Sequence, residues 1–490
     1  MSAMGDNTIS KGVKTSYGLI AFFTTLLHNV FLLYHVETFV SIYKIDKMSF
    51  WFGETVFLVW NSLNDPLFGW ASDKRYLTSG SSGSSVVLRR LNALRYSCPL
   101  LAISFMSFWI PWLNPTAQFV ICLCLYDSFL TMIDLHHSAL LADLSVSAQV
   151  RASLNAHSSF FSAIGSLSVL FSYMLWDREN MATFQLYCGS LTIVAIVGYF
   201  FATKMLEKSF KKHQTKMDSS DESPSQQDKA ISPAEDKKAM KNFLKQLSSH
   251  QNFLWFSGMN LIQVFHCHFN SNFFPLFLET LLGDAVSPSL SSLLLGVSFI
   301  APHINNLYFL TLCRKYGVYS VIRFLFAIKL ALAVFMYFMG PNHLALLCIF
   351  IASNRVFTEG TCKLLNLVIS DLVDEDYVIH RRSQAISALM FGTAALVSKP
   401  GQTIAPLVGT WLLSWQTGHD VFESGNVLGS IKLTLGDSGD IYRQAVFHLV
   451  VFIPIICAVF QLAAWSQFSL KGKRLKWVKS MRQGAQFTTV

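Results

Sequence analysis

Twelve runs of mostly apolar residues, each about 20 residues or longer, constrain the fold of this chain more than any other feature. Such runs cross a bilayer as helices, because only helices and closed barrels pair every backbone polar group in lipid. Only 14% of the residues are charged, against about 25% in soluble domains. We therefore predict an all-α polytopic membrane protein. The runs cover residues 16–42, 48–71, 95–113, 117–141, 153–175, 182–203, 253–279, 287–312, 318–339, 343–369, 384–415 and 444–466.

A polar segment divides the runs into two sets of six. Residues 204–250 are rich in Lys, Ser, Asp, Glu and Gln and contain Pro224 and Pro233, a composition typical of a disordered cytosolic linker. The predicted domains are an N-terminal six-helix half at 1–203, the linker at 204–250, a C-terminal half at 251–466 and a basic tail at 467–490.

The two halves carry a faint internal repeat. Asn64 stands nine positions before Asp73 in the second run, and Asn305 stands nine positions before Arg314 in the eighth. Parallel six-helix repeats with a binding site at their interface describe the major facilitator architecture. We predict that fold, with two pseudo-symmetric halves.

Basic residues mark alternate loops. They follow the second, eighth, tenth and twelfth runs, and few lie in the opposite loops. By the positive-inside rule, both termini and the linker face the cytosol. The net charge of +9 thus reflects membrane topology rather than nucleic-acid binding. We expect the plasma membrane rather than an endolysosomal one. The basic residues are Lys74, Arg75, Arg89, Arg90, Arg95, Arg314, Lys315, Arg381, Arg382, Lys471, Lys473, Arg474, Lys476, Lys479 and Arg482.

Polar residues lie on one face of the second run and one face of the fourth. Asn61 and Asp65 are one turn apart, and Asp127, Thr131 and Asp134 follow an i, i+4, i+7 pattern. Their oxygens suit Na⁺ or a transferable proton. Interhelical hydrogen bonding that only stabilises the bundle is the alternative.

Lys399-Pro400-Gly401 interrupts the eleventh run, because proline removes a backbone donor and glycine loosens the helix. A buried lysine needs an acidic partner, and Asp65 or Asp134 would supply one. The alternative is that Lys399 extends to the membrane interface.

Three further charged residues are predicted to form a structural ion pair or a gate. Arg355 and Glu359 are one turn apart in the tenth run, and Asp73 lies in the charged turn after the second.

The seventh run is unusually polar. We expect Gln263, His266 and Asn270 to share a face that lines the central cavity and contacts a polar solute. His266 and His268 point about 200° apart on a helix, so they cannot bind one metal ion, and no metal site is predicted.

Several motifs together resemble the glycoside–pentoside–hexuronide:cation symporters, the melibiose permease group of the major facilitator superfamily. The motifs span the chain apart from the linker. They are Asn-Asp-Pro-Leu-Phe-Gly-Trp at 64–70, Ser-Tyr-Gly at 16–18, Thr-Met-Ile-Asp at 131–134, the acidic run at 371–376 before Arg381 and Arg382, and Lys399.

The resemblance implies roles for individual residues. The cation site of the family would fall on Asn61, Asn64, Asp65 and Thr131. Asp134 would lie between cation and substrate, and Lys399 would be the coupling lysine.

Other positions depart from the family. Asn61 replaces an acid, so part of the cation site is changed. Thr25, Ser138 and Ser159 stand where the family has sugar-recognition residues, so a melibiose-like cargo is not implied.

Together these features predict a secondary transporter that couples a small polar or amphipathic solute to Na⁺ or H⁺ by alternating access. A lipid-like or lysolipid cargo is one alternative, and a scaffold or receptor that no longer transports is another. We expect a monomer without a bound cofactor and find no enzyme motif. The expected substrate cavity comprises Thr25, His28, Asp134, Ser138, Ser159, Gln263, His266, Asn270 and Lys399.

Overall fold

The computed structural model describes residues 10–78, 83–176, 180–217, 233–283, 288–382, 384–417 and 439–488. Regular structure in these ranges is entirely helical, which confirms the all-α prediction. Each of the twelve predicted runs overlaps a helix. The chain forms two compact units, which are described separately.

Unit 1 contains Met1–Ser249, Asn366–Leu396 and Leu470–Val490. It includes the last part of α12 and most of α13. Its elements are α1 (Lys11–Glu37), η1 (Thr38–Ile42), α2 (Lys47–Thr78), α3 (Gly83–Met106), α4 (Pro115–Asp143), α5 (Ala148–Gly165), α6 (Ser168–Leu175), α7 (Ala182–Met217), α8 (Pro233–Ser248), α12 (Leu344–Ile379), α13 (Ser387–Ser398) and α16 (Gly472–Thr488).

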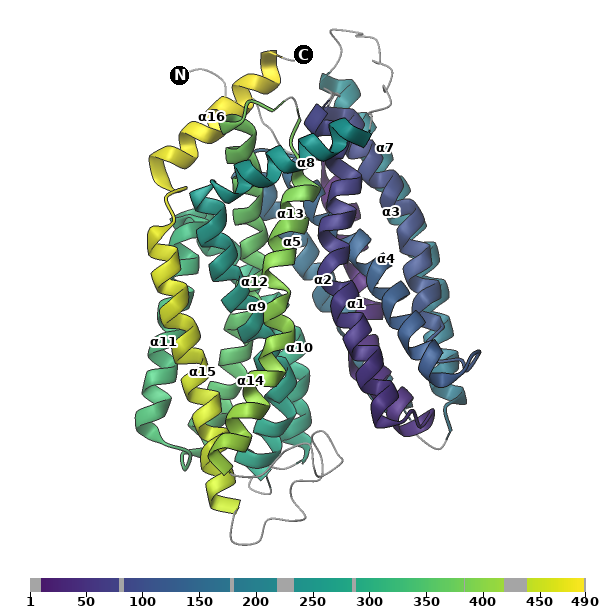
Figure 1. The fold of residues 1–490 in the computed structure, drawn as a ribbon, viewed down its shortest axis with the longest axis vertical. Coiled ribbons are helices and arrows are strands. Elements are labelled where there is room, and N and C mark those ends of the chain that lie inside the picture. The colour runs from purple at the N-terminus through teal and green to yellow at the C-terminus, as the bar shows by residue number, and fades with distance from the viewer. Residues whose placement is uncertain are drawn as a thin grey trace. The chain divides into compact units, whose positions relative to one another are not determined.

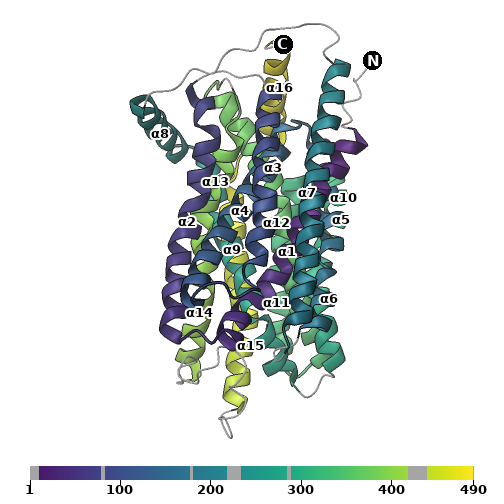
Figure 2. The ribbon, with the colours of Figure 1, turned by 90° about the vertical axis from the view of Figure 1, so that its right-hand side faces the viewer.

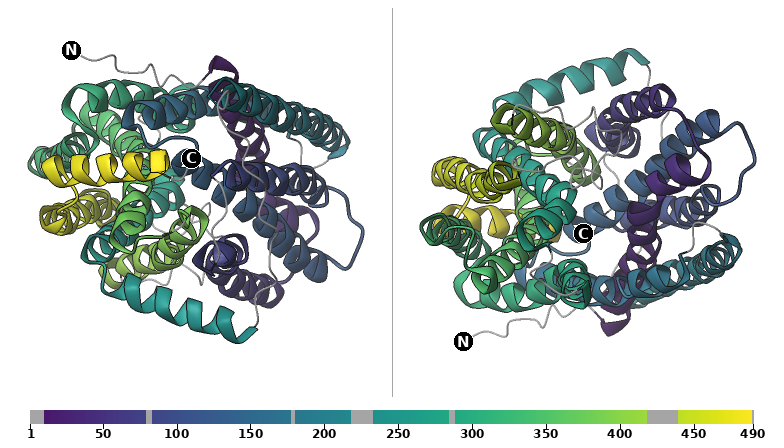
Figure 3. Two further views of the ribbon diagram at one scale, coloured as in Figure 1. Left: turned by 90° about the horizontal axis from the view of Figure 1, so that it is seen from above. Right: turned by 90° about the horizontal axis from the view of Figure 1, so that it is seen from below.

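The helices of unit 1 pack side by side. α1 lies against α5 and α7, α3 against α4 and α7, and α2 against α4 (Figures 2 and 3).

Local sequence sets where α4 begins: the Asn114 side chain accepts a hydrogen bond from the backbone N–H of Thr116, and Pro115 occupies the first turn. Aromatic side chains fill the interior. Trp109 meets Phe184 edge to face, with ring centroids 5.2 Å apart.

Unit 2 contains His250–Leu365 and Val397–Ser469. α9 packs on α14 and α15, and α11 packs on α15 (Figure 1). Phe269, Phe273 and Phe277 form an aromatic stripe along α9 that faces the core. Apart from the first part of α12, its elements are α9 (Gln251–Phe277), η2 (Leu278–Leu282), α10 (Pro288–Tyr316), α11 (Val318–Met339), α14 (Pro400–Thr417) and α15 (Gly439–Gln467).

Six described helices are long and apolar enough, by length and composition, to cross a membrane: α1, α4, α7, α11, α12 and α15. Two other predicted runs are each divided between two helices. The run at 153–175 comprises α5 and α6, and the run at 384–415 comprises α13 and α14.

The predicted disordered linker at 204–250 is wrong in two stretches. α7 continues to Met217, and α8 spans Pro233–Ser248; residues 218–232 lie outside the described ranges. The polar composition of this segment suggested disorder because α8 has few apolar residues, although these residues recur at helical spacing. Phe243 and Leu247, one turn apart, are buried, and the Gln246 side chain accepts a hydrogen bond from Arg382 at 3.0 Å.

The two units also differ from the predicted halves at 1–203 and 251–466. Residues 366–396 and 470–490 belong to unit 1, although they follow the linker in sequence. The basic tail at 467–490 includes α16. Acidic residues at the end of α12 account for this division, because their cationic partners lie on α5 and α16.

Candidate functional site

The facing sides of α2 and α4 bring buried polar residues together in unit 1. The Asn64 side chain donates hydrogen bonds to the Asp127 carboxylate and to the Thr131 hydroxyl, the latter at 3.1 Å. Asn64 is fully buried, and Asp127 is 8% exposed. A carboxylate inside a membrane helix costs at least about 2.5–3.5 kcal/mol, so such positions usually have a function. The structure thus joins Asn64 to both Asp127 and Thr131, as the facing polar surfaces of the two runs predict.

Asn61 and Asp65 are also buried on α2. Beside Asp65, α2 comes very close to α13: a Cβ added to Gly392 would lie 2.5 Å from the Asp65 carbonyl oxygen. One turn further, a Cβ on Gly69 would lie 2.8 Å from the carbonyl of Ala388. Two glycines therefore permit backbone contact next to the polar cluster.

Asp134 lies on α4 but differs from its neighbours, since it is exposed. Its carboxylate interacts electrostatically with the hydroxyl groups of Tyr17 and Tyr126. The Tyr17 ring stacks on His137, with centroids 3.9 Å apart. Asp134 therefore faces α1, as a residue between a cation and a solute would, although binding of either stays a prediction.

The positions that correspond to family sugar contacts are engaged inside unit 1. Thr25 on α1 donates to the Ser162 hydroxyl on α5 at 3.1 Å, and His28 meets the Tyr126 hydroxyl at 3.3 Å. Ser159 is 1% exposed, and Ser138 is half-buried. The hydrogen bond of Thr25 joins α1 to α5, so this side chain contributes to helix packing.

Asp73 forms the predicted ion pair, with a partner on α3. Arg90 binds Asp73 at 3.1 Å and also pairs with Asp143 at the end of α4. Asp73 accepts a hydrogen bond from the Leu389 backbone at 2.9 Å, and Asp143 accepts one from the Ser387 hydroxyl. The first turn of α13 is therefore held by two carboxylates of unit 1.

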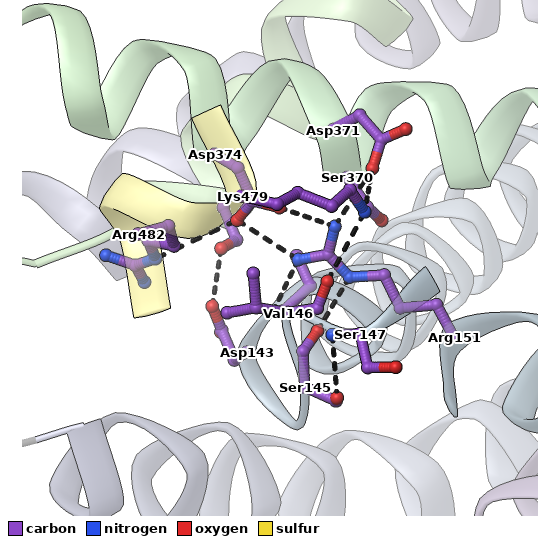
Figure 4. A network of polar contacts seen from close by, with 12 residues as sticks. Asp143, Ser145, Val146, Ser147, Arg151, Ser370, Asp371, Asp374, Lys479 and Arg482 are labelled. Atoms are coloured by element: carbon purple, nitrogen blue, oxygen red, sulfur yellow. Dashed lines mark hydrogen bonds and ion pairs between the residues drawn. The ribbon is translucent and has the colours of Figure 1, made fainter. Parts of the chain in front are cut away.

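A second buried network surrounds Arg151 on α5 (Figure 4). Its guanidinium binds both oxygens of Asp374, at 2.7 and 3.1 Å, and lies 3.4 Å from Asp371. On α16, Lys479 binds Asp371 at 2.7 Å, and Arg474 binds the fully buried Glu375 at 2.7 Å. The acidic motif that carries part of the family resemblance thus anchors both α5 and α16.

The polar residues of α9 lie in the core of unit 2. Gln263 is fully buried, donates to the Thr358 carbonyl at 2.7 Å and accepts from Gln461 at 2.6 Å. His266 is also fully buried, and Asn270 is 3% exposed. The structure therefore does not support a cavity-lining role for this face. Gln263 and Asn270 bond neighbouring helices of unit 2 instead: the Asn270 side chain donates to the Thr358 hydroxyl at 3.4 Å and accepts from Asn354 at 3.1 Å.

Arg355 and Glu359 lie on the same face of α12. Glu359 interacts electrostatically with Arg355 and accepts from the Ser271 hydroxyl at 3.4 Å. The Arg355 guanidinium lies 5.2 Å from the centre of the Phe274 ring. The two residues are thus close enough for their charges to interact, and both the ion pair and a gating role stay predictions.

The predicted helix break at Lys399 is confirmed. α13 ends at Ser398, α14 begins at Pro400, and Lys399 itself is half-buried. A Cβ added to Gly401 would lie 2.6 Å from the Leu261 carbonyl oxygen, so the glycine allows α14 to approach α9 closely. Pairing of Lys399 with an aspartate of α2 or α4 concerns both units and stays a prediction.

Lys329 on α11 is a buried residue that is not among the predicted site residues. It is 2% exposed, in the middle of a predicted membrane helix. The sequence does indicate that this residue is unusual, since an ammonium group within a membrane span is costly and rare. The sequence does not indicate its contacts, because they come from the distant helices α9 and α15.

Apolar helices that enclose paired carboxylates and amides define a multi-pass membrane protein of the transporter class. The chain belongs to the family described as MFS/sugar transport protein, whose model matches residues 16–468. This match confirms that it is a major facilitator superfamily member.

Close relatives carry a common name. The chain is 58% identical over 482 residues to transmembrane protein 180 of Gallus gallus, covering 96% of this chain and 94% of that protein. It is 53% identical to transmembrane protein 180 of Mus musculus, covering 98% and 96%.

Solved transporters share the fold. A bacterial homologue of the iron transporter ferroportin in its outward-facing state has a TM-score of 0.63 and 12% identity, covering 94% of this chain and all of that one. The major facilitator transporter FucP in its outward conformation has a TM-score of 0.58 and 11% identity, with 94% and 98% covered.

Proposed function

We propose that this chain is a secondary active transporter that couples a small polar or amphipathic solute to H⁺ or Na⁺ by alternating access. The hydrogen bonds of Asn64 to Asp127 and Thr131 carry the proposal most directly. They place a carboxylate, an amide and a hydroxyl in one buried cluster, and Asp65 lies one residue from Asn64. A membrane helix would rarely keep such a cluster for packing alone.

The coupling ion is H⁺ rather than Na⁺ in this proposal. Asn61 stands where the resembling symporters have an acid, so the cluster has one fewer charge to balance Na⁺. Burial disfavours a charged carboxylate, so proton binding to Asp65 or Asp127 is favoured. Protonation of Asp127 would also change the hydrogen bonds of Asn64. The pair of helices α2 and α4 would then have two arrangements, one for each protonation state.

The cargo differs from a simple melibiose-like sugar. Thr25 is engaged by Ser162, and Ser159 is buried. Asp134 is exposed, so its carboxylate could contact a polar solute from the side of α1. Coupling of such a solute would depend on Lys399, the position that matches the family's coupling lysine.

The basic loops support an orientation with both termini in the cytosol. In that orientation the Arg151 network lies at the cytosolic ends of α5 and α12. Buried ion pairs with bidentate geometry hold such ends in one conformation, and their rearrangement would accompany alternating access.

An untargeted metabolite comparison tests the proposal. Cells that lack the protein are compared with cells that express the wild type, Asp127→Asn or Asp46→Asn. Asp46→Asn is the matched control, because it removes an exposed carboxylate that precedes α2 and lies outside the cluster. We expect one solute class to change with the wild type and the control but not with Asp127→Asn. If folded wild-type protein changes no solute, transport is contradicted, and the scaffold alternative is favoured.

A further inference from the structure

A buried ammonium group marks a second polar centre, inside unit 2. Lys329 donates to the side-chain oxygens of Gln461 at 3.2 Å and of Gln263 at 3.5 Å, and it lies 5.0 Å from the centre of the Phe326 ring. The groups that act electrostatically on Lys329 are the thiols of Cys267, Cys457 and Cys362. A cation in this environment favours negative charge close by.

Two cysteines provide that charge when they ionise. Cys267 on α9 and Cys362 on α12 have their sulfur atoms 2.7 Å apart. The Gln263 side-chain amide donates toward both sulfurs, at 3.4 and 3.3 Å. Lys329 interacts electrostatically with Cys267. An amide donor and a cation on the same pair of sulfurs would stabilise thiolates.

A carboxylate completes the cluster. Glu359 lies three residues before Cys362 on α12, so both face the same side of that helix. Ligand atoms of Cys267, Glu359 and Cys362 all lie within 4.8 Å of one another. Glu359 and Cys362 are half-buried, which leaves the cluster reachable by an ion, and Cys267 is 7% exposed.

We propose that Cys267, Cys362 and Glu359 bind one borderline-soft divalent metal ion of the Zn²⁺ type. Two thiolates and a carboxylate are a ligand set that such ions prefer, with a water molecule or a solute as fourth ligand. Thiolates on a tetrahedral ion at ~2.3 Å lie ~3.8 Å apart, so the sulfurs move apart by roughly 1 Å on binding. Rotation of the Cys362 side chain on its half-buried side supplies that movement.

The charges balance in this low-dielectric setting. Binding of M²⁺ releases one proton from each of the two thiols to solvent. The two positive charges of the ion replace those of the two protons, so the net charge of the cluster does not change. The ligands with the ion then carry a net charge of −1, beside two cations: Arg355, which acts on Glu359, and Lys329, which acts on Cys267. Outer contacts are also in place, since Gln263 faces both sulfurs and Ser271 bonds Glu359 at 3.4 Å.

This site is independent of the proposed coupling cluster in unit 1. It also differs from the sequence prediction of no metal site, which rested on the geometry of His266 and His268 and on the lack of metal-ligand spacing in the sequence. The ligands lie at a neighbouring position of α9 and on α12, so their proximity depends on how these helices pack.

The test uses the full chain, purified in detergent with a phosphine reductant. Co²⁺ is the optical probe, because thiolate ligation gives a charge-transfer absorption, and bound Zn²⁺ is counted by elemental analysis. The variants are Cys267→Ser, Cys362→Ser and Glu359→Gln. Cys348→Ser is the matched control, since it removes a half-buried thiol from α12 outside the cluster. Monodispersity and thermal unfolding confirm that each variant is folded.

We expect the wild type and Cys348→Ser to bind one ion per chain with the charge-transfer absorption. Each of the two other cysteine variants should lose the absorption, and Glu359→Gln should weaken binding about tenfold or more. The proposal is overturned if folded wild type binds no Zn²⁺ and shows no absorption. It is also overturned if the absorption persists when both cysteines are replaced. A disulfide bond between Cys267 and Cys362 in protein purified without a reductant would overturn it as well.

Discussion

Arg151 on α5 binds both carboxylate oxygens of Asp374 near the end of α12, at 2.7 and 3.1 Å, and each side chain is only 1% exposed. The guanidinium also donates to the Ala142 and Ser145 carbonyls, at 3.0 and 2.7 Å. A charge with this many partners is stable inside a protein, but its removal strands the opposite charge.

Arg151→Met should therefore lower the stability of the folded protein by about 3–5 kcal/mol, because the buried Asp374 would lose its bidentate partner and keep Arg482 only at 3.8 Å. The thermal unfolding temperature in detergent measures the effect. Lys211→Ala is the control: that lysine pairs with Glu207 at 2.7 Å but is 57% exposed, so its loss should cost less than about 1 kcal/mol. Equal effects of the two variants would mean that the buried network adds no particular stability.

Close backbone contact beside Asp65 gives a second prediction. Gly392→Ala places a methyl group 2.5 Å from the Asp65 carbonyl oxygen, so α2 and α13 must separate, at a cost of about 1–3 kcal/mol. Gly258→Ala on α9 is the matched control. A Cβ at Gly258 meets nothing within 4 Å, so the change should stabilise the helix by about 0.5–1 kcal/mol. Thermal unfolding of both variants measures this difference, and unchanged stability of Gly392→Ala would refute the close contact.

The sequence predicted most of the fold, because span length and loop charge are local properties. The helix break at Lys399 and the facing of Asn64 and Thr131 were also readable from spacing. Contacts across long sequence separations were not. Nothing near Arg151 in sequence indicates that Asp374 would be its partner, 223 residues away.

Buried polar residues were the least predictable part of the candidate site. A polar residue in a span can face a cavity or bond a neighbouring helix, and periodicity does not distinguish the two. Gln263 was expected to contact a solute, yet its amide bonds Thr358 and Gln461. The same difficulty applies to α8. Phe243 and Leu247 indicate a packed helix only once it is known that both side chains are buried.

Membrane topology is tested with an epitope inserted at residue 225. The basic loops predict that the antibody stains cells only after permeabilisation, since this segment would face the cytosol. An epitope in the loop between α11 and α12, on the opposite side, should stain intact cells and serves as the control. Staining of intact cells at position 225 would reverse the assigned orientation.

Lys399 tests the coupling mechanism. Lys399→Ala should leave a folded protein in its membrane but abolish coupled uptake, because the ammonium is expected to respond to cation binding at the carboxylates. Lys399→Ala with Asp65→Asn should be as stable as the wild type and still uncoupled. Wild-type uptake by both Lys399→Arg and Lys399→Gln would show that the lysine only reaches the membrane interface.

The most direct measurement of the central claim is uptake of the identified solute into proteoliposomes, with the pH gradient and the Na⁺ gradient varied separately. With Asn61 in place of an acid and Asp127 bonded to Asn64, we predict that uptake follows the inward proton gradient and hardly changes with Na⁺. Asp127→Asn should abolish the response to pH, and Asp46→Asn, which changes an exposed carboxylate, should retain it. A strict Na⁺ requirement with flat pH dependence, or gradient-driven uptake that survives Asp127→Asn unchanged, would contradict proton coupling through this cluster.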